Sequence, residues 1–218
     1  MSRVLVSVPT LDSVSASFHA SQIRLRWDDG NKYGYSVKCN SLTYYARNEF
    51  AFDAINGKYD YLVCIDSDML LEPDTVIRLV ADIESSGADL VTGIYFKRMM
   101  PTAPVIYRKI DWYEDEVLGA QEEVEAYEGY PEDGGLFEID GCGMGCCVIR
   151  VGVLTELVTR YRMAPFTPMP RLSEDLSFCW RMKQIGKRML ADPEILPGHA
   201  GLYVYRKGDW EGGTRNEE

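Results

Sequence analysis

Strand-like and helix-like segments alternate along the first hundred residues, and this alternation restricts the possible folds more than any other feature of the sequence. Apolar, strand-like runs are predicted at 3–8, 35–39, 61–65 and 89–95. Strands that alternate with helices at this spacing predict right-handed crossovers, which place parallel strands side by side. The expected fold class is therefore α/β, with a mostly parallel sheet that helices cover on both faces.

Two helices are predicted between these runs. The first follows Asn40 or Ser41, either of which could cap it, and ends at Gly57. The second ends at Gly87 and has four apolar side chains on one face, which are Val76, Leu79, Val80 and Ile83. Each helix would connect two strands of the sheet.

The second half of the chain has a different pattern. Between about 101 and 140, short strand-like pieces are broken by glycine and proline, which predicts antiparallel strands and loops. A glycine-rich passage, GCGMGCCVIR, leads into a helix near 151–162, and another helix is predicted from Ser173 to Ile185, before Gly186. The residues after about 206 are polar and are expected to form a mobile tail.

The net charge of -11 comes from one segment of the chain. Residues 111–140 hold 12 of the 34 acidic residues and no Lys or Arg, whereas the rest of the chain has 22 acidic and 23 basic residues. An acidic segment repels the phosphates of nucleic acid, so duplex DNA is a disfavoured partner.

Two further features concern the cellular compartment. No apolar run approaches the roughly 20 residues that cross a bilayer, and no secretory signal or lipidation motif is recognised, which predicts a protein without a membrane span. The six cysteines are scattered, and several lie in apolar segments, as buried free thiols do. Both features favour the cytoplasm.

The sequence YDYLVCIDSDMLLEPD contains the strongest candidate for a functional site. A buried strand at 61–65 ends in Asp66, Ser67 and Asp68, and ligands bind beyond the carboxyl ends of the strands in open α/β sheets. Alternation along an extended chain would place Asp66 and Asp68 on the same side, where their oxygens suit Mg²⁺ or Mn²⁺. The alternative is an ordinary acidic turn that closes a strand.

This Asp-x-Asp triplet after a hydrophobic strand resembles the metal-binding signature of GT-A glycosyltransferases. Four further segments are similar to parts of that family and occur in the same order, namely VLVSVPT, ARNEF, SEDLSFCWRMKQIG and DPEILPGHAG. The resemblance covers nearly all of residues 3–201 and is to small, inverting, family-2-like enzymes of bacteria and phages. It implies one GT-A domain over residues 1–206, with a nucleotide-binding half at about 1–100, an acceptor-side half at about 101–206, and a polar tail at 207–218.

The resemblance implies roles for residues in the first two of these segments. Pro9, Thr10 and Asp12, which follow the first strand, would line the base and ribose of the nucleotide. Arg47, in the ARN segment, could pair with a phosphate or with the base. The alternative for Arg47 is a solvated arginine on a helix.

His199 resembles the histidine that completes the metal site in many GT-A enzymes. Together with Asp66 and Asp68 it would hold Mn²⁺ or Mg²⁺ against the diphosphate of the donor. Asp66 and Ser67 would also contact the donor itself. The alternative for His199 is a loop histidine with a structural hydrogen bond.

Glu174 and Asp175 lie where the resemblance places the catalytic base of inverting family members. Ser173 would cap the helix, and the helix dipole would keep a carboxylate in the first turn ionised. Asp175 is the first candidate for the base that takes the proton of the acceptor hydroxyl, and Glu174 is the second. Acidic residues are also common in first helical turns for electrostatic reasons alone.

The function that the resemblance implies is metal-dependent transfer of a sugar from a nucleotide diphosphate sugar, with UDP favoured, to a hydroxyl of a glycan, protein or small molecule. The GCGMG passage would be the family's glycine-containing turn beneath the acceptor site. One alternative is a GT-A module that binds a nucleotide sugar or glycan without turnover. Another is an aspartate-dependent phosphotransferase, although those enzymes continue after Asp-x-Asp with glycine and threonine, where this chain has Met69 and Leu70.

Overall fold

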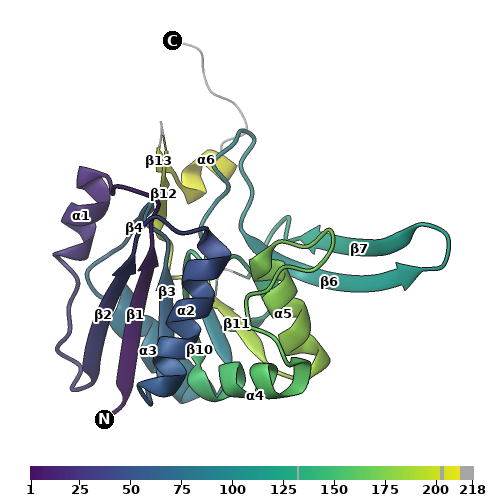
Figure 1. Ribbon diagram of the computed structural model, residues 1–218. Helices are drawn as coiled ribbons and strands as arrows, with labels where there is room; N and C mark the ends of the chain where they lie inside the picture. The colour runs from purple at the N-terminus through teal and green to yellow at the C-terminus, as the bar shows by residue number, and fades with distance from the viewer. Residues whose placement is uncertain (132, 202–203, 212–218) are drawn as a thin grey trace.

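The computed structural model describes residues 1–131, 133–201 and 204–211, and it has a central seven-stranded sheet between two layers of helices (Figure 1). The strands of this sheet are β1 (Arg3–Pro9), β2 (Lys32–Lys38), β3 (Tyr61–Ile65), β5 (Leu90–Gly93), β8 (Phe137–Glu138), β10 (Cys146–Arg150) and β11 (Met189–Asp192). The helices are α1 (Ala16–Gln22), α2 (Thr43–Asn56), α3 (Thr75–Ser86), α4 (Val151–Tyr161), α5 (Glu174–Gln184) and α6 (Lys207–Glu211).

The order of strands in the central sheet is β2-β1-β3-β10-β5-β11-β8. Five strands run in one direction, and only β10 and β8 run against them. The prediction of a mostly parallel α/β sheet is therefore confirmed. Strand β10 was not predicted, since GCGMGCCVIR was expected only to lead into a helix. Its CCVI portion is a fully buried apolar run, as a central strand requires.

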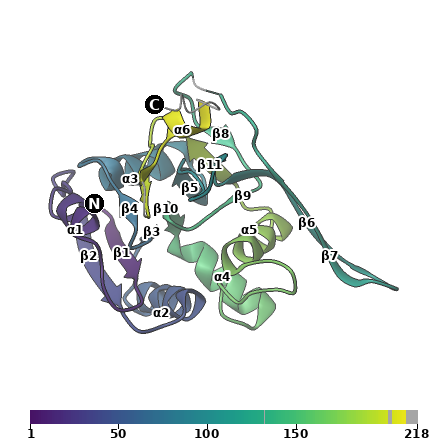
Figure 2. The same ribbon diagram turned by 90° about the horizontal axis from the view of Figure 1, so that it is seen from above.

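The helices cover both faces of this sheet, as expected (Figure 2). On one face, α2, α4 and α5 pack in a cluster that includes Phe50, Leu154 and Phe178. On the other face, α1 and α3 pack over a cluster that includes Phe18 and Leu79. Two separate hydrophobic cores thus pack on the two faces of the sheet. Residues at the carboxyl-end edge of the sheet are therefore attached to a well-packed structure.

The predicted C-termini of the helices agree with the structure more closely than the predicted N-terminal caps do. Gly87 follows α3 with φ +68°, a left-handed conformation that favours glycine, and Gly57 follows α2. The expected cap of α2 was wrong, because Leu42 occupies the N-cap position and Asn40 has a left-handed backbone. Ser173 does precede α5, but its hydroxyl donates to the Asp175 carboxylate and caps no backbone amide.

Two small antiparallel sheets lie beside the central one. The first has the order β13 (Val204–Tyr205), β12 (Gly198–Ala200) and β4 (Met69–Leu70). The second has the order β7 (Gly119–Ala126), β6 (Ile106–Asp115) and β9 (Gly141–Cys142). Antiparallel strands were expected between 101 and 140 and are present, but β6 and β7 are longer than the short pieces that the sequence suggested.

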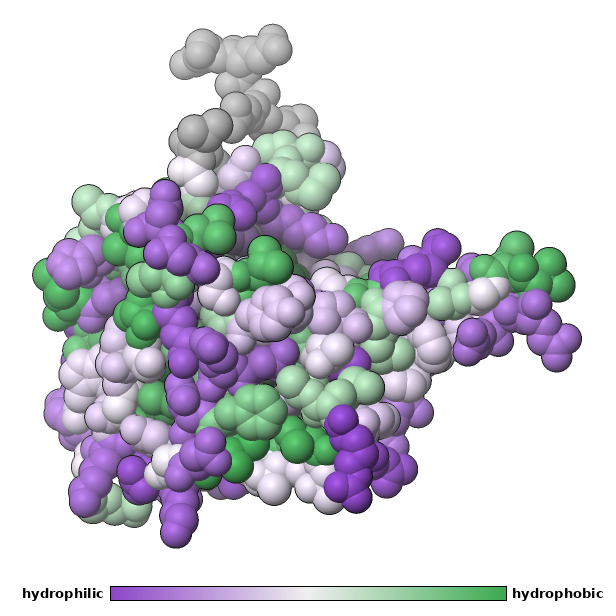
Figure 3. All heavy atoms as spheres, viewed as in Figure 1, coloured by the Kyte–Doolittle hydropathy of each residue, from purple (hydrophilic) through white to green (hydrophobic). Residues whose placement is uncertain are grey.

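Strands β6 and β7 form an arm that projects from the body of the molecule and contains much of the acidic segment (Figures 1 and 2). The far end of the arm is hydrophobic (Figure 3), where Val117 and Leu118 are 89% and 71% exposed. The middle of the arm contacts the body, since the Trp112 indole donates to the Pro170 carbonyl at 3.0 Å and the Lys183 ammonium lies 3.1 Å from Asp111.

Three remaining expectations can be compared with the described residues. Residues 207–211, expected in a mobile tail, form α6, and residues 212–218 lie outside the described part of the chain. All six cysteines are free, and five are buried, with Cys39 exposed. Within the described ranges, no helix combines the length and the apolar character needed to cross a membrane.

A pair of acidic side chains links α3 to the end of β11 and gives a prediction about stability. Burial raises the pKa of Asp82 to about 7, and the neighbouring Asp192 carboxylate adds to this rise. The unfolded chain releases the Asp82 proton near pH 3.8, whereas the folded protein keeps it up to about pH 7. The retained proton therefore stabilises the fold fully at low pH, and this contribution is lost as the pH rises through 7.

We expect Asp82→Asn to remove this loss, because an amide is neutral at every pH of interest. At pH 8 the variant should gain about 1–2 kcal/mol in free energy of unfolding, a figure reduced from the full shift because Asp82 is half-exposed. At pH 4 the variant and the wild type should be equally stable. Urea unfolding at both pH values measures the difference, and an equal difference at pH 4 and pH 8 would contradict this explanation.

Candidate functional site

The acidic triplet at the end of β3 forms a tight turn. The amide of Met69 donates to the Asp66 carbonyl at 3.1 Å, which closes residues 66–69, and the amide of Asp66 donates to the Gly145 carbonyl at 3.0 Å. The triplet is therefore a turn and not the extended segment that was expected, although Asp66 and Asp68 both line one cavity. Asp66 faces Arg47, whereas Asp68 faces His199 and Arg98.

This turn forms one wall of a cavity of about 360 Å³ at the carboxyl-end edge of the sheet, which we call the edge cavity. Its lining residues are Pro9, Thr10, Leu11, Ser41, Thr43, Asp66, Ser67, Asp68 and Arg98. Five of the predicted site residues are thus brought together: Pro9, Thr10, Asp66, Ser67 and Asp68. The lining does not include Asp12, which is exposed and, among the described residues, accepts a hydrogen bond from the Ser13 hydroxyl alone.

Four residues of the lining were not predicted. Leu11, Ser41 and Thr43 belong to the segments that follow β1 and β2, and those segments reach the same edge because the strands are parallel. Arg98 follows β5 at some distance, and its guanidinium lies 2.9 Å from the Asp68 carboxylate. The only signal in the sequence is a basic pair, Lys97 and Arg98, shortly after a predicted strand.

His199 reaches the acidic turn through backbone pairing between β12 and β4. His199 lies opposite Met69 in this pairing, and the Ala200 amide donates to the Asp68 carbonyl at 2.8 Å. As a result the His199 Nε2 atom lies 3.5 Å from Asp68 Oδ2. A histidine more than a hundred positions away in sequence is therefore held beside Asp68 by main-chain hydrogen bonds.

The surroundings of His199 determine which of its ring nitrogens bears a proton. The Nδ1 atom lies 2.7 Å from the Phe96 carbonyl, which can only accept, so Nδ1 must donate. In a neutral imidazole the Nε2 atom then has a lone pair that points at another acceptor, Asp68 Oδ2. Two facing acceptors need a positive charge between them, which either a proton on Nε2 or a metal cation would supply.

Asp68 has a further property that suits a cation. Its Oδ1 atom is buried and has no hydrogen-bond partner among the described residues. Burial alone would raise the pKa of Asp68, but the pKa is lowered because His199 and Arg98 favour the ionised carboxylate. The 3.5 Å between the two candidate donor atoms is close to the roughly 3 Å that separates neighbouring oxygens around Mg²⁺.

The donor set is smaller than the sequence predicted. Within the described part of the chain, no three His, Cys, Asp or Glu side chains lie close enough together to hold a metal ion. Asp66 does not join Asp68 and His199, because its carboxylate is paired with Arg47. The residues present thus fit a cation that takes two ligands from the protein and the rest from a bound ligand or water.

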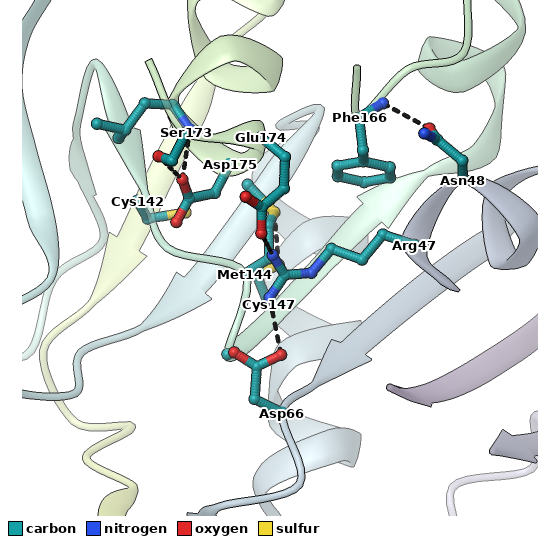
Figure 4. A network of polar contacts seen from close by, with 12 residues as sticks. Arg47, Asn48, Asp66, Cys142, Met144, Cys147, Phe166, Ser173, Glu174 and Asp175 are labelled. Atoms are coloured by element: carbon teal, nitrogen blue, oxygen red, sulfur yellow. Dashed lines mark hydrogen bonds and ion pairs between the residues drawn. The ribbon is translucent and has the colours of Figure 1, made fainter. Parts of the chain in front are cut away.

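Arg47 joins the two acidic parts of the site (Figure 4). Its Nη2 atom donates to Asp66 at 2.7 Å and its Nη1 atom donates to Glu174, so one guanidinium connects β3 to α5. The side chain is only 5% exposed and lies outside the lining of the edge cavity. In this structure Arg47 therefore pairs with carboxylates, and it is neither a solvated arginine nor free for a phosphate.

We expect Arg47→Met to destabilise the protein by about 3 kcal/mol, because two largely buried carboxylates would lose the cation between them. Arg98→Met is the matched control. Arg98 also pairs with an aspartate but is half-exposed, so its loss should cost under about 1 kcal/mol. Urea unfolding at pH 7 measures both variants, and equal stabilities would show that the Arg47 network does not hold the site together.

The two predicted base candidates have different surroundings. Glu174 is held by Arg47, and burial raises its pKa although the guanidinium opposes that rise. The Oδ1 atom of Asp175 accepts from the Ser173 hydroxyl and from the Leu176 amide at 2.8 Å. Its Oδ2 atom has no hydrogen bond among the described residues. Asp175 therefore has an oxygen free to accept a proton, whereas Glu174 is already paired.

The glycines of the GCGMG passage have a structural role. A Cβ atom on Gly143 would lie 2.1 Å from the Tyr95 hydroxyl, and one on Gly145 would lie 2.9 Å from the Tyr95 ring. The Gly145 amide also donates to that hydroxyl at 3.1 Å. The expectation that these glycines leave room for an acceptor sugar is corrected, because Tyr95 fills the space. The Tyr95 ring packs edge-on against His199, so the glycines help to position the histidine.

Comparisons with known proteins support the fold. No family model and no curated protein matches the sequence. Among solved structures, the protein is similar to A197 from STIV, with a TM-score of 0.61 and 19% identity over 91% of this chain and 86% of the other. It is also similar to GalNAc-T7, crystallised with UDP, GalNAc and Mn²⁺, with a TM-score of 0.51 and 14% identity. That match covers 98% of this chain and 45% of the other. These likenesses show a GT-A-like fold.

Proposed function

We propose that this protein is a metal-dependent glycosyltransferase, which moves a sugar from a nucleotide diphosphate sugar to an acceptor hydroxyl. The observation that supports this best is the pairing of β4 with β12, which holds the Nε2 atom of His199 3.5 Å from Asp68, a residue that lines a polar cavity. The cavity lies at the carboxyl ends of parallel strands, where open α/β sheets bind their ligands.

Asp68 and His199 are the residues that would hold Mn²⁺ or Mg²⁺. Their donor atoms face each other, Asp68 Oδ1 is unpartnered, and the hydrogen bond to Phe96 orients the imidazole. A cation bound there supplies positive charge beside the departing diphosphate. Of the predicted metal ligands, Asp66 is assigned to the donor, because Arg47 already neutralises one of its oxygens.

The remaining lining of the edge cavity suits the donor. Pro9 and Thr10 would lie against the nucleoside, and Ser67 and Thr43 would offer hydroxyls beside the diphosphate. Arg98 is half-exposed, so it can leave Asp68 and pair with a phosphate oxygen. UDP is the favoured nucleotide, and the crystallisation of GalNAc-T7 with UDP and Mn²⁺ is consistent with this choice.

Asp175 is assigned as the base. The acceptor oxygen would attack the anomeric carbon while the bond from that carbon to the diphosphate oxygen breaks. The proton of the acceptor hydroxyl would pass to the free Oδ2 atom of Asp175. Glu174 is the second candidate, and release from Arg47 would have to precede its use. Attack opposite the leaving group inverts the anomeric configuration.

The test is a panel of nucleotide diphosphate sugars, with release of the nucleotide measured with Mn²⁺, with Mg²⁺ and with a chelator. We expect slow hydrolysis of at least one donor that depends on the metal, and faster release when an acceptor is present. Binding of a donor without any release would instead indicate the inactive GT-A module. Release of a nucleoside monophosphate and a sugar 1-phosphate, without free sugar, would indicate chemistry at phosphorus, as in phosphotransfer.

A further inference from the structure

A second cavity, of about 640 Å³, lies between the outer face of α2 and the loop at 164–168, and we call it the α2 cavity. Its lining residues are Tyr44, Tyr45, Asn48, Glu49, Phe52, Ala164, Thr167 and Pro168. Figure 3 looks onto the face of the molecule that includes α2, where hydrophobic and polar side chains are mixed. The volume is in the range of small-molecule sites.

Side chains along one stripe of α2 form one wall of this cavity. Tyr45, Asn48, Glu49 and Phe52 are spaced three and four residues apart, so they share a face of the helix. Tyr45 is 56% exposed and Phe52 is 38% exposed, although both are large aromatic residues. The Tyr44 ring stacks on the Tyr45 ring at 4.4 Å, which restricts the position of the exposed ring. Flat apolar faces are thus held open to the cavity.

Asn48, on the same face of α2, adds a hydrogen-bond donor to the lining of the cavity. Asn48 is only 8% exposed, and its Oδ1 atom accepts from the Phe166 amide at 2.8 Å (Figure 4). Because that backbone amide can only donate, the other end of the side chain must be the Nδ2 donor. This donor has no hydrogen bond among the described residues. The Nδ2 atom is not one of the fully buried unpartnered atoms, so water reaches it, and a ligand hydroxyl could take the place of that water.

The opposite wall is rigid. The Arg181 guanidinium, which is buried, donates to the Pro165 carbonyl at 3.1 Å and to the Thr167 carbonyl at 2.6 Å. The Thr167 hydroxyl donates to the Ala164 carbonyl at 2.8 Å. A wall fixed in this way costs little ordering entropy when a ligand binds.

We propose that the α2 cavity binds carbohydrate and that its occupant is the glycan part of the acceptor, an inference that rests on the proposed glycosyl transfer. A sugar ring has an apolar face of C–H groups and an edge of hydroxyls. The exposed rings of Tyr45 and Phe52 could stack on the apolar face of the sugar. The Asn48 amide and the Glu49 carboxylate could form hydrogen bonds with its hydroxyls. The Oε2 atom of Glu49 lies 3.4 Å from the Lys38 Nζ atom, so the Oε1 atom can accept a hydrogen bond from a sugar hydroxyl.

The position of the cavity supports an acceptor over an unrelated ligand. The first turn of α2 contributes Thr43 to the edge cavity and Tyr44 and Tyr45 to the α2 cavity. The loop that forms the opposite wall continues into α5, which begins with Glu174 and Asp175. The α2 cavity thus shares the first turn of α2 with the candidate donor site, and its other wall continues to the helix that begins with the candidate base.

A groove elsewhere on the surface provides the contrast. A cavity of about 660 Å³ between α1 and β2 is also lined by aromatic residues, including Trp27, Tyr33 and Tyr35. There the tyrosine hydroxyls already have partners, since Tyr35 donates to Gln22 at 3.0 Å and Tyr33 donates to Asp29 at 2.6 Å. Tyr35 is 46% exposed, so it is a matched control for Tyr45.

The experiment uses the full chain on an array of free oligosaccharides, followed by saturation-transfer NMR with the best binder. We expect saturable binding that Tyr45→Ala weakens about tenfold, because one stacked ring is lost. Tyr45→Phe, which keeps the ring, and Tyr35→Ala should bind as the wild type does. Asn48→Asp keeps the acceptor for Phe166 and removes the donor, so it should also weaken binding.

The inference is overturned if no oligosaccharide binds with saturation, or if Tyr45→Ala binds as tightly as the wild type. Binding only of an apolar dye or a peptide at this cavity would also overturn it. Metal-dependent donor hydrolysis, measured on the same preparations, should be unchanged in Tyr45→Ala. Hydrolysis without sugar binding would refute this inference alone, whereas sugar binding without hydrolysis would refute the proposed transfer and leave a glycan-binding cavity.

Discussion

Asp68→Asn is expected to lower Mn²⁺-dependent hydrolysis of the nucleotide sugar by at least about 100-fold. The substitution keeps the size of the side chain but removes the charge that faces His199 Nε2 at 3.5 Å. It also replaces one of the two carboxylate oxygens by an NH2 group, which cannot bind a cation, and the Oδ1 oxygen is buried with no hydrogen-bond partner among the described residues. Titration of the variant with Mn²⁺ should show the loss of the tightest binding event.

Asp12→Asn is the matched control for this experiment. The resemblance placed Asp12 at the ribose, but the residue is exposed and lies outside the lining of the edge cavity, so its substitution should leave hydrolysis within about twofold. Thermal unfolding of both variants checks that the fold is intact. An Asp68→Asn enzyme that works at the wild-type rate with Mn²⁺ would show that the cation is held elsewhere.

Asp175→Asn is expected to reduce kcat for transfer by about 10²–10⁴, with the KM for the donor nearly unchanged. The substitution removes the free carboxylate oxygen and adds a group that cannot take a proton at neutral pH. Glu174→Gln should reduce kcat less, because Glu174 is already paired with Arg47. It should instead lower stability, since Arg47 would lose one of its two charged partners.

The comparison of these two variants identifies the base. If Glu174→Gln abolishes transfer and Asp175→Asn does not, the roles of the two residues are reversed. NMR of the product gives an independent check, because attack opposite the diphosphate inverts the anomeric configuration. Net retention would rule out both residues as the base of a single displacement.

Regular features of the fold could be predicted from the sequence because they depend on local patterns. The alternation of apolar runs and helices predicted the mostly parallel sheet. The apolar face of α3 predicted that helix, and Gly87 predicted where it ends. Strand β10 was missed because it enters the sheet between β3 and β5 from a distant part of the chain. No local pattern indicates which two strands a third one will separate.

The site was predictable in its position but less so in its contacts. Asp66 and Asp68 do end a buried strand, and Pro9 and Thr10 do lie beside them. Their directions could not be predicted, because the turn at 66–69 depends on hydrogen bonds to Gly145 and within the turn. The pairing of Arg47 with both Asp66 and Glu174 required residues from three separated segments to meet.

Some predictions failed because one residue type can serve several purposes. The GCGMG glycines accommodate the Tyr95 ring, and the sequence alone cannot distinguish that use from room for a sugar. Ser173 stands at the N-cap position, but its hydroxyl donates to Asp175 and caps no amide. The resemblance named segments that the fold brings together at one edge of the sheet, while the packing of individual side chains decides which of them line the cavity.

The small sheet of β4, β12 and β13 joins a core through β4, whose Met69 is fully buried, whereas none of the core residues in the described part of the chain belongs to β12 or β13. Each of its strands has only two or three residues, so few main-chain hydrogen bonds oppose its opening. Detachment of β12 would carry His199 away from Asp68 while α2, α3, α4 and the central sheet stay folded. The candidate cation site can therefore be lost through a local opening that costs far less free energy than global unfolding.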